Sequence, residues 1–454
     1  MNKKLILILT LLFLLLIGCN SSTQDEPQAV PADNATETPV EMDDVATEAV
    51  EPTATPEVAT ETPAEIEEDT AVQDESQTTQ EDIAAEAPAE SDDALAQDGP
   101  QAFPPEVVAE IQATMDALTA GTIPPGVVAW IDAPEYQFAG ASGSANLAEG
   151  APMSPEAAFR IGSITKMFTA VVIMQLAEDD VLTLDDPLAL WLPEVAEQLP
   201  YGDQITVRHL LTHTSGLFNV VEHEAYYADL FTAMVVDEAT GNVTLDCVAR
   251  DPNDTLARYV YGKEAQFEPG TQWRYSNTNY TLLGMIIETA TEMPLAEAYR
   301  TNIYEPLGMT STFLDCYEAP LADVVHGYTV SGDAMTDVTE LHESVGWSAG
   351  GLVSTAPDLI AFARGLFGGE LFDNPETVAA MTTPAPDSAY GLGIMLQEGY
   401  MGHAGYIAGF RSVLNYSPEF DTVVVMFYNT DAAGPEESQA DIMNPVLPLL
   451  SAAE

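Results

Sequence analysis

The hydrophobic and polar positions divide the chain into three stretches. Residues 1–19 hold a short apolar run behind a pair of lysines. Residues 20–101 show no apolar periodicity and consist mainly of Ala, Thr, Pro, Gln, Glu and Asp. From residue 102 to residue 454, apolar runs with the periods of strands and helices alternate with turns that contain Gly and Pro. The pattern predicts one folded domain over residues 102–454.

Strand patterns occur at both ends of this domain, and helix patterns occur between them. The expected strands are 127–131, 137–140, 409–416 and 422–428. The expected helices are 164–176, 207–211, 281–289 and 358–366. This order predicts an α+β fold, with one antiparallel sheet formed from both ends of the domain, flanked by helices, and an inserted helical lobe. The polar stretch 218–263 fits neither period, so we expect a loop-rich elaboration near the site entrance.

The first 19 residues resemble a bacterial lipoprotein signal. Lys3 and Lys4 precede the apolar run Leu5–Ile17, which Gly18 and Cys19 follow. The run is short for a transmembrane span, and a small residue followed by cysteine suits a signal that is cleaved before a lipidated cysteine. The resemblance implies an exported protein anchored to a membrane through Cys19, on its periplasmic or extracellular face. An ordinary signal peptide and an N-terminal transmembrane anchor are the alternatives.

Acidic residues dominate the second stretch and the chain as a whole. The formal net charge is −61, from 73 acidic and 12 basic residues, and residues 20–101 carry 24 of the acidic residues and no basic one. A segment with so few apolar side chains and so many like charges cannot bury enough surface to fold, so we predict a disordered acidic tether. The charge also argues against binding to a phosphate backbone, and we expect no nucleic-acid partner.

The few lysines of the chain point to one site. Only four are present, at positions 3, 4, 166 and 263, and Lys166 lies three residues after Ser163. Residues three apart share one face of a helix, so the Lys166 amine can reach the Ser163 hydroxyl. The residues after Ser163 are apolar nearly all round, which is typical of a buried helix. A desolvated lysine beside a serine indicates an acyl-transfer site.

Two further motifs follow, in the order seen in penicillin-recognising serine enzymes. Tyr275-Ser276-Asn277 is a Tyr-x-Asn motif, and His403-Ala404-Gly405, between two strand-like segments, is a basic residue-x-Gly motif. On these motifs the chain resembles the family of class C β-lactamases and serine-type D-Ala-D-Ala carboxypeptidases, from residue 123 to about residue 429. Four stretches support the resemblance: Leu210–Leu217, Phe267–Gly270, Glu305–Met309 and Ser348–Leu352.

The resemblance and the needs of acyl transfer assign a role to each catalytic residue. Ser163 is the nucleophile. Its proton goes either to Lys166 or to a Tyr275 phenolate that Lys166 stabilises, so the identity of the base stays open. The resemblance implies an oxyanion hole formed by the backbone N–H groups of Ser163 and Tyr406, just past Gly405.

The substrate contacts follow from the same resemblance. Asn277 is expected to hold the substrate's amide carbonyl, and Trp347 resembles an aromatic wall of the family's cleft. His403 and Gly405 belong to the substrate-binding strand. Many family members have threonine where this chain has Ala404. In those members the threonine hydroxyl binds a substrate carboxylate. A protonated His403 and Arg411 are the remaining candidates for that carboxylate.

Two other motifs suggest different chemistry and are weaker. Gly346–Gly350 fits the Gly-x-Ser-x-Gly nucleophile elbow, but the helical region before it lacks the βα units that such an elbow needs. His209 and His213 are four apart on an expected helix, which could suggest zinc. Leu210 stands where a zinc protease has glutamate, so structural roles are favoured for both histidines. We predict no metal and no cofactor.

Two cysteines remain in the folded domain. Cys247 and Cys316 form an even pair, which outside the cytoplasm is a possible disulfide. Spacing alone does not bring their Cα atoms together, so bonded and free cysteines both stay possible.

These residues predict a hydrolase that forms an acyl-enzyme through Ser163. We expect a D-Ala-D-Ala carboxypeptidase or a related D-amino-acid peptidase, a monomer that acts on small molecules or peptides of cell-wall type. An esterase or a β-lactamase of the same fold is the alternative, and Ala404 places the β-lactamase last. From another class, a penicillin-binding sensor or wall-binding lipoprotein would acylate and turn over slowly.

Overall fold

The computed structural model describes residues 99–226, 229, 234–236, 243–332, 334–342 and 344–452. The predicted signal peptide, Cys19 and almost all of the predicted tether lie outside these residues. Among the helices of the described part, none combines the length and the hydropathy that crossing a bilayer requires.

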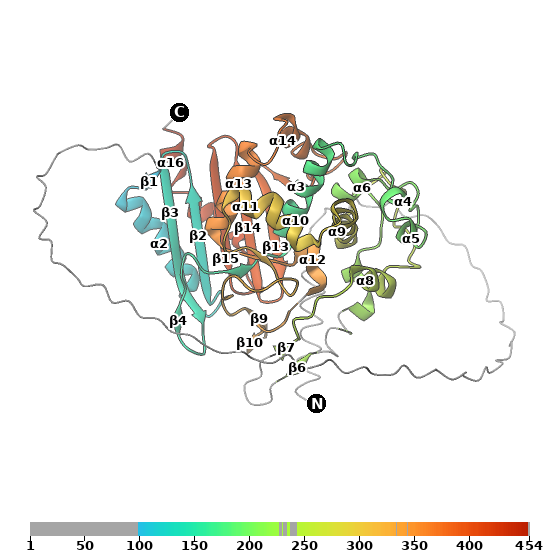
Figure 1. Cartoon of the computed structure of the whole chain (residues 1–454). Coiled ribbons are helices and arrows are strands. Elements are labelled where there is room, and N and C mark those ends of the chain that lie inside the picture. Colours follow the sequence, from blue (N-terminus) through green and yellow to red (C-terminus); the bar gives the residue numbers. More distant parts are fainter. Residues whose placement is uncertain are drawn as a thin grey trace, which may run out of the picture. The chain divides into compact units, whose positions relative to one another are not determined.

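A mixed sheet forms the centre of the described domain (Figure 1). Its strands follow the order β1-β3-β2-β15-β14-β13-β12, with β4 paired to β3. All neighbours are antiparallel except β1 and β3. The bounds are β1 Gln101–Ala102, β2 Gly126–Asp132, β3 Tyr136–Asn146, β4 Ala151–Pro152, β12 Met395–Gln397, β13 Tyr400–Ile407, β14 Phe410–Ser417 and β15 Thr422–Tyr428.

Strands β2 and β15 join the two ends of the domain in the middle of this sheet. They pair antiparallel, from Val127 opposite Tyr428 to Asp132 opposite Val423. Every residue of β15 is buried, and nearly every residue of β2 is too. Continuous Val, Ile, Met and Phe suit strands that are covered on both faces. The predicted sheet built from both ends of the domain is therefore confirmed.

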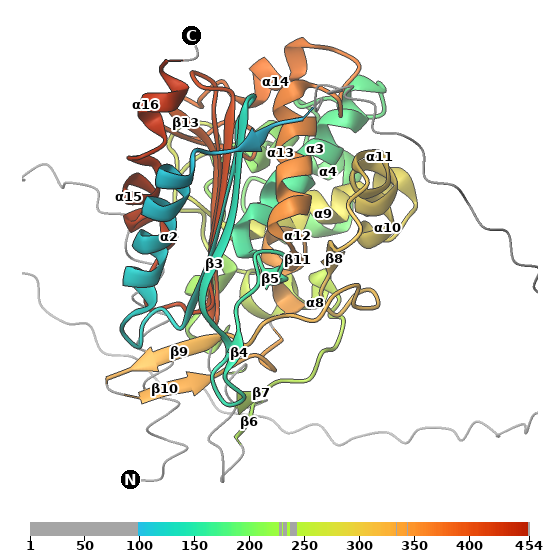
Figure 2. The same cartoon turned by 90° about the vertical axis from the view of Figure 1, so that its left-hand side faces the viewer.

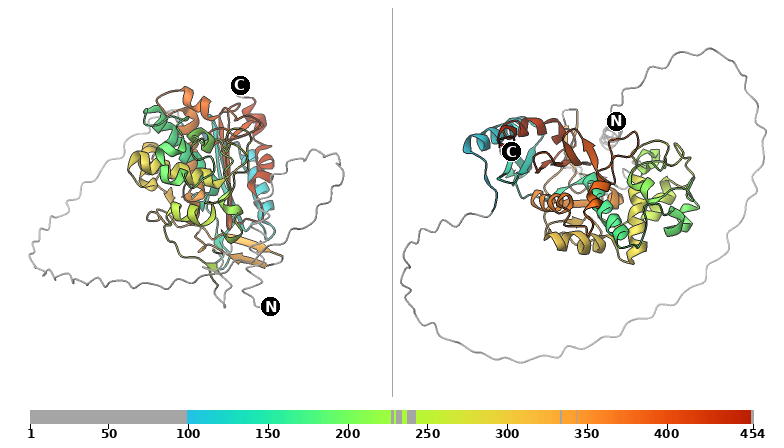
Figure 3. Two further views of the ribbon diagram at one scale, coloured as in Figure 1. Left: turned by 90° about the vertical axis from the view of Figure 1, so that its right-hand side faces the viewer. Right: turned by 90° about the horizontal axis from the view of Figure 1, so that it is seen from above.

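Helices cover both faces of the sheet, as Figures 2 and 3 show. On one face, α2, α15 and α16 enclose a core that contains Ile111, Met426 and Ile442. On the other face, α3, α9 and α13 enclose the larger core, which continues into the helical lobe. The longer helices are α2 Pro105–Thr119, α3 Thr165–Glu178, α8 Pro252–Tyr259, α9 Asn277–Thr291 and α13 Ala356–Gly368. The shorter helices are α4 Leu188–Trp191, α5 Pro193–Ala196, α6 Val207–Leu211, α10 Leu295–Tyr299, α11 Glu305–Leu307, α12 Trp347–Gly350, α14 Glu376–Met381, α15 Gln439–Met443 and α16 Leu447–Leu450.

Short strands complete the architecture beside the site. A three-stranded sheet has the order β5-β11-β8, and β5 ends just before the predicted nucleophile. Two hairpin-like pairs, β9 with β10 and β6 with β7, lie outside the main sheet. The bounds are β5 Phe159–Arg160, β6 Val235–Val236, β7 Val243–Thr244, β8 Phe313–Leu314, β9 Tyr328–Ser331, β10 Ala334–Asp337 and β11 Leu352–Ser354.

The expected elements agree with the structure where their periodicity is uninterrupted. Strand β15 and helix α6 have the predicted bounds, whereas α9 begins at Asn277, four residues earlier than predicted. The pattern put the basic residue-x-Gly motif between two strand-like segments, which is wrong, but the strand position that the resemblance implies for His403 agrees with its place in the middle of β13. The described part of the irregular stretch 218–263 also includes a helix, α8.

Candidate active site

Ser163 lies in a tight turn between strand β5 and helix α3. The turn is a 3₁₀ segment, Gly162–Ile164, and Gly162 has φ +51°, a left-handed conformation that glycine adopts without strain. A Cβ atom on Gly162 would lie 2.7 Å from the backbone N of Tyr406. Glycine therefore allows the nucleophile turn and strand β13 to approach each other closely.

Lys166 is fully buried in the first turn of α3 and contacts three oxygen atoms. Its Nζ lies 3.0 Å from Ser163 Oγ, 2.8 Å from Asn277 Oδ1 and 2.5 Å from the Ala349 carbonyl. Burial lowers the pKa of Lys166 well below its usual 10.5. The neutral amine can donate to Asn277 and Ala349 and turn its lone pair to the serine hydroxyl. The ammonium can donate to all three oxygens, so both states have partners here.

Tyr275 lies two residues before α9 and contacts Ser163, and Asn277 is the first residue of α9 and contacts Lys166. The Tyr275 hydroxyl is 2.9 Å from Ser163 Oγ, and the Lys166 Nζ lies 4.9 Å from the centre of the Tyr275 ring. The backbone N–H of Asn277 donates to Asn219 Oδ1 at 3.0 Å, and this hydrogen bond fixes the position of Asn277. The Asn277 Oδ1 orients the lysine, and its Nδ2 donates one N–H to Asn219 Oδ1 at 3.4 Å, so one N–H is left for a carbonyl.

The edge of β13 supplies the other wall of the site. A Cβ atom at Gly405 would lie 2.0 Å from the Ile161 carbonyl, so only glycine fits where this strand passes the nucleophile turn. Beyond Gly402, the short strand β12 no longer pairs with β13. Gly162 lies close to the Tyr406 amide, and the oxyanion hole of the Ser163 and Tyr406 N–H groups stays an expectation from the resemblance.

His403 is buried, and both of its ring nitrogens are used. Nδ1 lies 2.6 Å from the Ala404 carbonyl, which only accepts, so the proton is on Nδ1. Nε2 then accepts from the Tyr390 hydroxyl at 3.1 Å. Burial, and secondarily the charge of Lys166, lowers the pKa of His403 to about 3. The expectation that a protonated His403 holds a substrate carboxylate is therefore wrong.

Residues 109–444 match the family model named Beta-lactamase, which covers more than half of the chain. The chain belongs to the β-lactamase family. Both the predicted fold class and the family part of the resemblance are thereby confirmed.

Several members of this family resemble the chain. The D-aminopeptidase of Gluconobacter oxydans (strain 621H) is 29% identical over 333 residues, which cover 68% of this chain and 57% of the relative. The structure of a D-stereospecific amidohydrolase from Streptomyces sp. is 31% identical, with a TM-score of 0.62, and covers 74% of this chain and 97% of that one. The structure of a penicillin binding protein from Bacillus halodurans is 26% identical, with a TM-score of 0.58. The match covers 71% of this chain and 95% of that one. The chain spans less than two thirds of the length of the curated relatives it matches.

Trp347 and Arg411 differ from what was expected of them. Trp347 is only 3% exposed, and its ring packs towards Gly284 of α9 and lies 6.3 Å from the Tyr317 ring. A ring that is buried in this way does not form an exposed aromatic wall. The Arg411 guanidinium stacks 4.3 Å from the Tyr406 ring centre and lies 3.9 Å from a carboxylate oxygen of Glu436. A neighbouring carboxylate therefore competes with any substrate carboxylate for Arg411.

The two weaker motifs do not form sites within the described residues. Ser348 is buried in α12, and its Oγ donates to the Tyr280 carbonyl at 2.8 Å, which is unlike an exposed nucleophile elbow. His209 Nδ1 accepts from the backbone N–H of Thr206 and caps α6. His213 Nδ1 accepts from a different segment, the backbone N–H of Ser276. The preference for structural roles over zinc agrees with these contacts.

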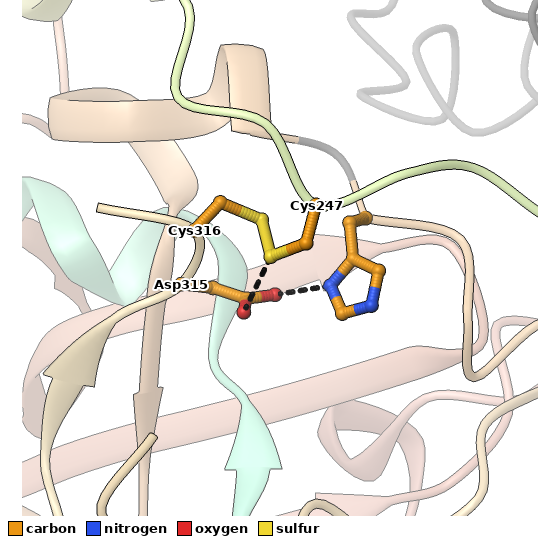
Figure 4. A group of neighbouring side chains, drawn as sticks. Cys247, Asp315 and Cys316 are labelled. Carbon is orange, nitrogen blue, oxygen red and sulfur yellow. Dashed lines mark hydrogen bonds and ion pairs between the residues drawn. A yellow bond between two sulfur atoms is a disulfide. The ribbon is translucent and has the colours of Figure 1, made fainter. Parts of the chain in front are cut away.

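Cys247 and Cys316 form a disulfide, with Cα atoms 5.1 Å apart, beside Asp315 (Figure 4). Together with His342 they make the one group of three or more metal-type side chains in the described part of the chain. The disulfide leaves no thiolate for a metal, and Asp315 already binds the buried guanidinium of Arg160 at 3.0 Å. We therefore interpret this group as a structural tie between the loop around Cys247 and the strand that precedes Ser163.

Sequence reasoning missed four groups that shape the site. They are the Ala349 carbonyl, Asn219, His213 and Tyr390. Each reaches the site through tertiary packing rather than through a local spacing. Two of them had a signal, because His213 and Ala349 lie in stretches that supported the family resemblance, Leu210–Leu217 and Ser348–Leu352.

The pKa of His403 predicts a pH dependence of stability. In the unfolded chain, His403 has a pKa of about 6.5 and is protonated below that pH. In the folded chain its pKa is about 3, so the ring stays unprotonated until the pH falls to about 3. Stability is therefore lost as the pH falls from about 6.5 towards 3, by up to about 1.4 kcal/mol per pH unit for this one group. His403→Gln should reduce that slope. Urea unfolding of both proteins at pH 4, 5, 6 and 7 measures it, and equal slopes would contradict a buried neutral His403.

Proposed function

We propose that this protein is a serine hydrolase that forms an acyl-enzyme on Ser163. The observation that carries the proposal is the placement of Ser163 Oγ, 3.0 Å from the Lys166 amine and 2.9 Å from the Tyr275 hydroxyl. Two proton-accepting groups at one oxygen, beside two backbone N–H groups for an oxyanion, are what acylation of a serine requires.

The reaction then proceeds in two halves. As Ser163 Oγ attacks the substrate carbonyl carbon, its proton passes to Lys166 or Tyr275, and the carbonyl oxygen becomes an oxyanion held by the two backbone N–H groups. The proton is returned to the leaving amine or alcohol, and the C–N or C–O bond breaks. Water, deprotonated by the same group, hydrolyses the ester on Ser163 and restores the hydroxyl.

For the substrate, we propose D-amino-acid peptides and amides, and within this class those that need no carboxylate contact. Three findings support this choice. Ala404 has no hydroxyl, both nitrogens of His403 are engaged, and Arg411 has Glu436 beside it. The names of the D-aminopeptidase and the D-stereospecific amidohydrolase point in the same direction. A D-Ala-D-Ala carboxypeptidase, an esterase and a β-lactamase are the alternatives among enzymes, and a monomer is still our expectation.

A comparison of four substrates tests the proposal. The purified domain is incubated with a D-alanine amide, a D-Ala-D-Ala tripeptide, a short nitrophenyl ester and a fluorescent penicillin. We expect turnover of the amide and the ester to exceed that of the tripeptide, and slow turnover of the penicillin. A stoichiometric burst with penicillin and no turnover of any substrate would instead favour the slowly reacting sensor.

The Ala404→Thr variant should shift this specificity. A threonine hydroxyl restores a donor for a charged group, which is worth about 1.5–3 kcal/mol, or roughly 10- to 100-fold in kcat/KM. We expect that gain on penicillins and D-Ala-D-Ala peptides and little change on the neutral ester, which serves as the matched control. Equal gains on both kinds of substrate, or no gain on either, would show that Ala404 does not set specificity.

We also propose that the protein is exported and anchored by lipid at Cys19. Lys3, Lys4, the apolar run after them and the Gly18-Cys19 pair support this, and a disulfide in the folded domain suits an oxidising compartment. Cys19→Ala should release the protein from membranes, and deletion of residues 20–100 should leave the kinetics of the domain unchanged. Membrane fractionation and steady-state assays measure these outcomes. A Cys19→Ala protein that stays in the membrane fraction would point to an uncleaved anchor.

A further inference from the structure

His213 forms hydrogen bonds to the backbone on both sides of Tyr275, the tyrosine that contacts the nucleophile. Its backbone carbonyl accepts from the N–H of Arg274 at 3.0 Å, and its Nδ1 accepts from the N–H of Ser276 at 3.2 Å. Between these two bonds, the centre of its ring lies 4.3 Å from the centre of the Tyr275 ring. One residue thus binds the chain before and after Tyr275 and packs on the side chain itself.

The contacts of His213 determine where its proton lies. A backbone N–H only donates, so Nδ1 must be the unprotonated nitrogen. Nδ1 also lies 3.1 Å from Asn279 Nδ2, and Asn279 is oriented by Ser215, whose hydroxyl donates to Asn279 Oδ1 at 2.6 Å. Burial, and secondarily the charge of Lys166, lowers the pKa of His213 well below 6.5. His213 is therefore a neutral ring with its proton on Nε2.

A histidine at this position is costly for folding alone. It is fully buried, its φ is +58°, and its Nε2 has no hydrogen-bond partner among the described residues. A purely apolar ring would fill the same space without an unsatisfied N–H group. What the histidine adds is the Nδ1 acceptor, and that acceptor is directed at the residue that follows Tyr275.

We propose that His213 is the positioning residue that sets the Tyr275 hydroxyl against Ser163, through its Nδ1 acceptor and its ring. This inference rests on the proposed acylation of Ser163. His213 contacts neither Ser163 nor the reacting carbonyl, and acts through Tyr275. A shift of about 1 Å in a reacting group costs up to about 10²-fold in rate, so loss of this support should be visible in acylation.

Two substitutions separate the acceptor from the ring. His213→Phe keeps a ring and removes Nδ1, whereas His213→Asn keeps an acceptor near Cγ, tolerates the left-handed backbone and removes the ring. We expect His213→Phe to slow labelling of Ser163 by a fluorophosphonate roughly 10- to 100-fold. His213→Asn should lose less than His213→Phe. In assays with the nitrophenyl ester, kcat should fall and KM should stay nearly unchanged for both variants.

His209→Phe is the matched control. His209 Nδ1 also accepts a backbone N–H at 3.2 Å, from Thr206, but this bond caps α6. The control should lower the Tm through the lost cap and leave the labelling rate unchanged, with rates expressed per folded protein by circular dichroism. Equal slowing by His209→Phe and His213→Phe would overturn the proposal, because it would show a general effect of disturbing this region.

A double-mutant cycle with Tyr275→Phe tests whether His213 acts through that tyrosine. In a Tyr275→Phe background there is no hydroxyl to place, so adding His213→Phe should slow labelling less than about twofold. A full additional loss would overturn the proposal. If His213→Phe does not fold, His213→Asn is carried through the same cycle. Failure to label Ser163 in the unmodified protein would contradict the proposed function itself, whereas normal labelling with unaffected variants would contradict only the role of His213.

Discussion

Ser163→Ala is expected to abolish covalent labelling by a fluorophosphonate or a β-lactam and to reduce hydrolysis of every substrate to background. The reason is that, among the serines of the described residues, only Ser163 presents its Oγ to Lys166 and Tyr275 together, at 3.0 Å and 2.9 Å. Loss of a serine nucleophile typically costs on the order of 10⁴- to 10⁶-fold in kcat. Intact-protein mass spectrometry detects the adduct, and stopped-flow assays measure the rate.

Ser348→Ala is the matched control for this experiment. Ser348 is a second serine in a hydrolase-like motif, but its Oγ donates to the Tyr280 carbonyl inside the helical packing. The variant loses one buried hydrogen bond, worth about 1 kcal/mol, and should keep most of its activity. An inactive Ser348→Ala beside an active Ser163→Ala would reverse the assignment of the nucleophile.

Local spacing explains why the nucleophile and its lysine could be predicted. Three residues along a helix bring Ser163 and Lys166 to one face whatever the rest of the fold does, and the structure places them in hydrogen-bond contact. Tyr275 lies 112 positions from Ser163, and no spacing rule connects the two. It could be predicted only from the order of motifs along the chain, which is a property of the family.

The environment of each residue was much harder to predict. His403 was expected to be available to substrate, but the Tyr390 hydroxyl, 13 residues earlier, binds its Nε2 and burial keeps the ring neutral. Trp347 was expected in the cleft wall, but Gly284 of α9 leaves room for its ring in the interior. Both outcomes depend on tertiary packing, which sets solvent access and therefore charge.

The fold followed from the sequence wherever one pattern dominated. Strand β15 is apolar without interruption and was predicted with correct bounds, whereas the pattern did not predict β13 and only the family resemblance implied a strand there. Gly402, His403 and Gly405 interrupt the strand pattern of β13. A Cβ atom at Gly402 would meet the Leu414 carbonyl of β14, and one at Gly405 would meet the Ile161 carbonyl beside the nucleophile turn. The element that forms the site wall was thus the least typical strand in composition, since its function requires residues that strands usually avoid.

Lys166→Ala and Tyr275→Phe are each expected to slow acylation by roughly 10²- to 10⁴-fold, the usual size of a general-base contribution. Both groups contact the same oxygen, and the Lys166 Nζ lies 4.9 Å from the centre of the Tyr275 ring, so their protonation states are coupled. The double variant should therefore lose much less than the product of the single losses. Rapid-mixing measurements of Ser163 acylation give these rates. Strictly multiplicative losses would show that the two residues have separate tasks.

The pH dependence of the same rates indicates which residue carries the proton. Burial lowers the pKa of Lys166, so its neutral, basic form is present well below pH 10.5. If the neutral lysine is the base, acylation rises with pH, levels off once the pH exceeds that lowered pKa, and keeps this profile in Tyr275→Phe. If a tyrosine phenolate is the base, the charged lysine stabilises it, and Lys166→Ala moves the rise to higher pH because the phenolate loses its cation. The lysine can satisfy its hydrogen bonds in either state, so this comparison of profiles decides between the two bases.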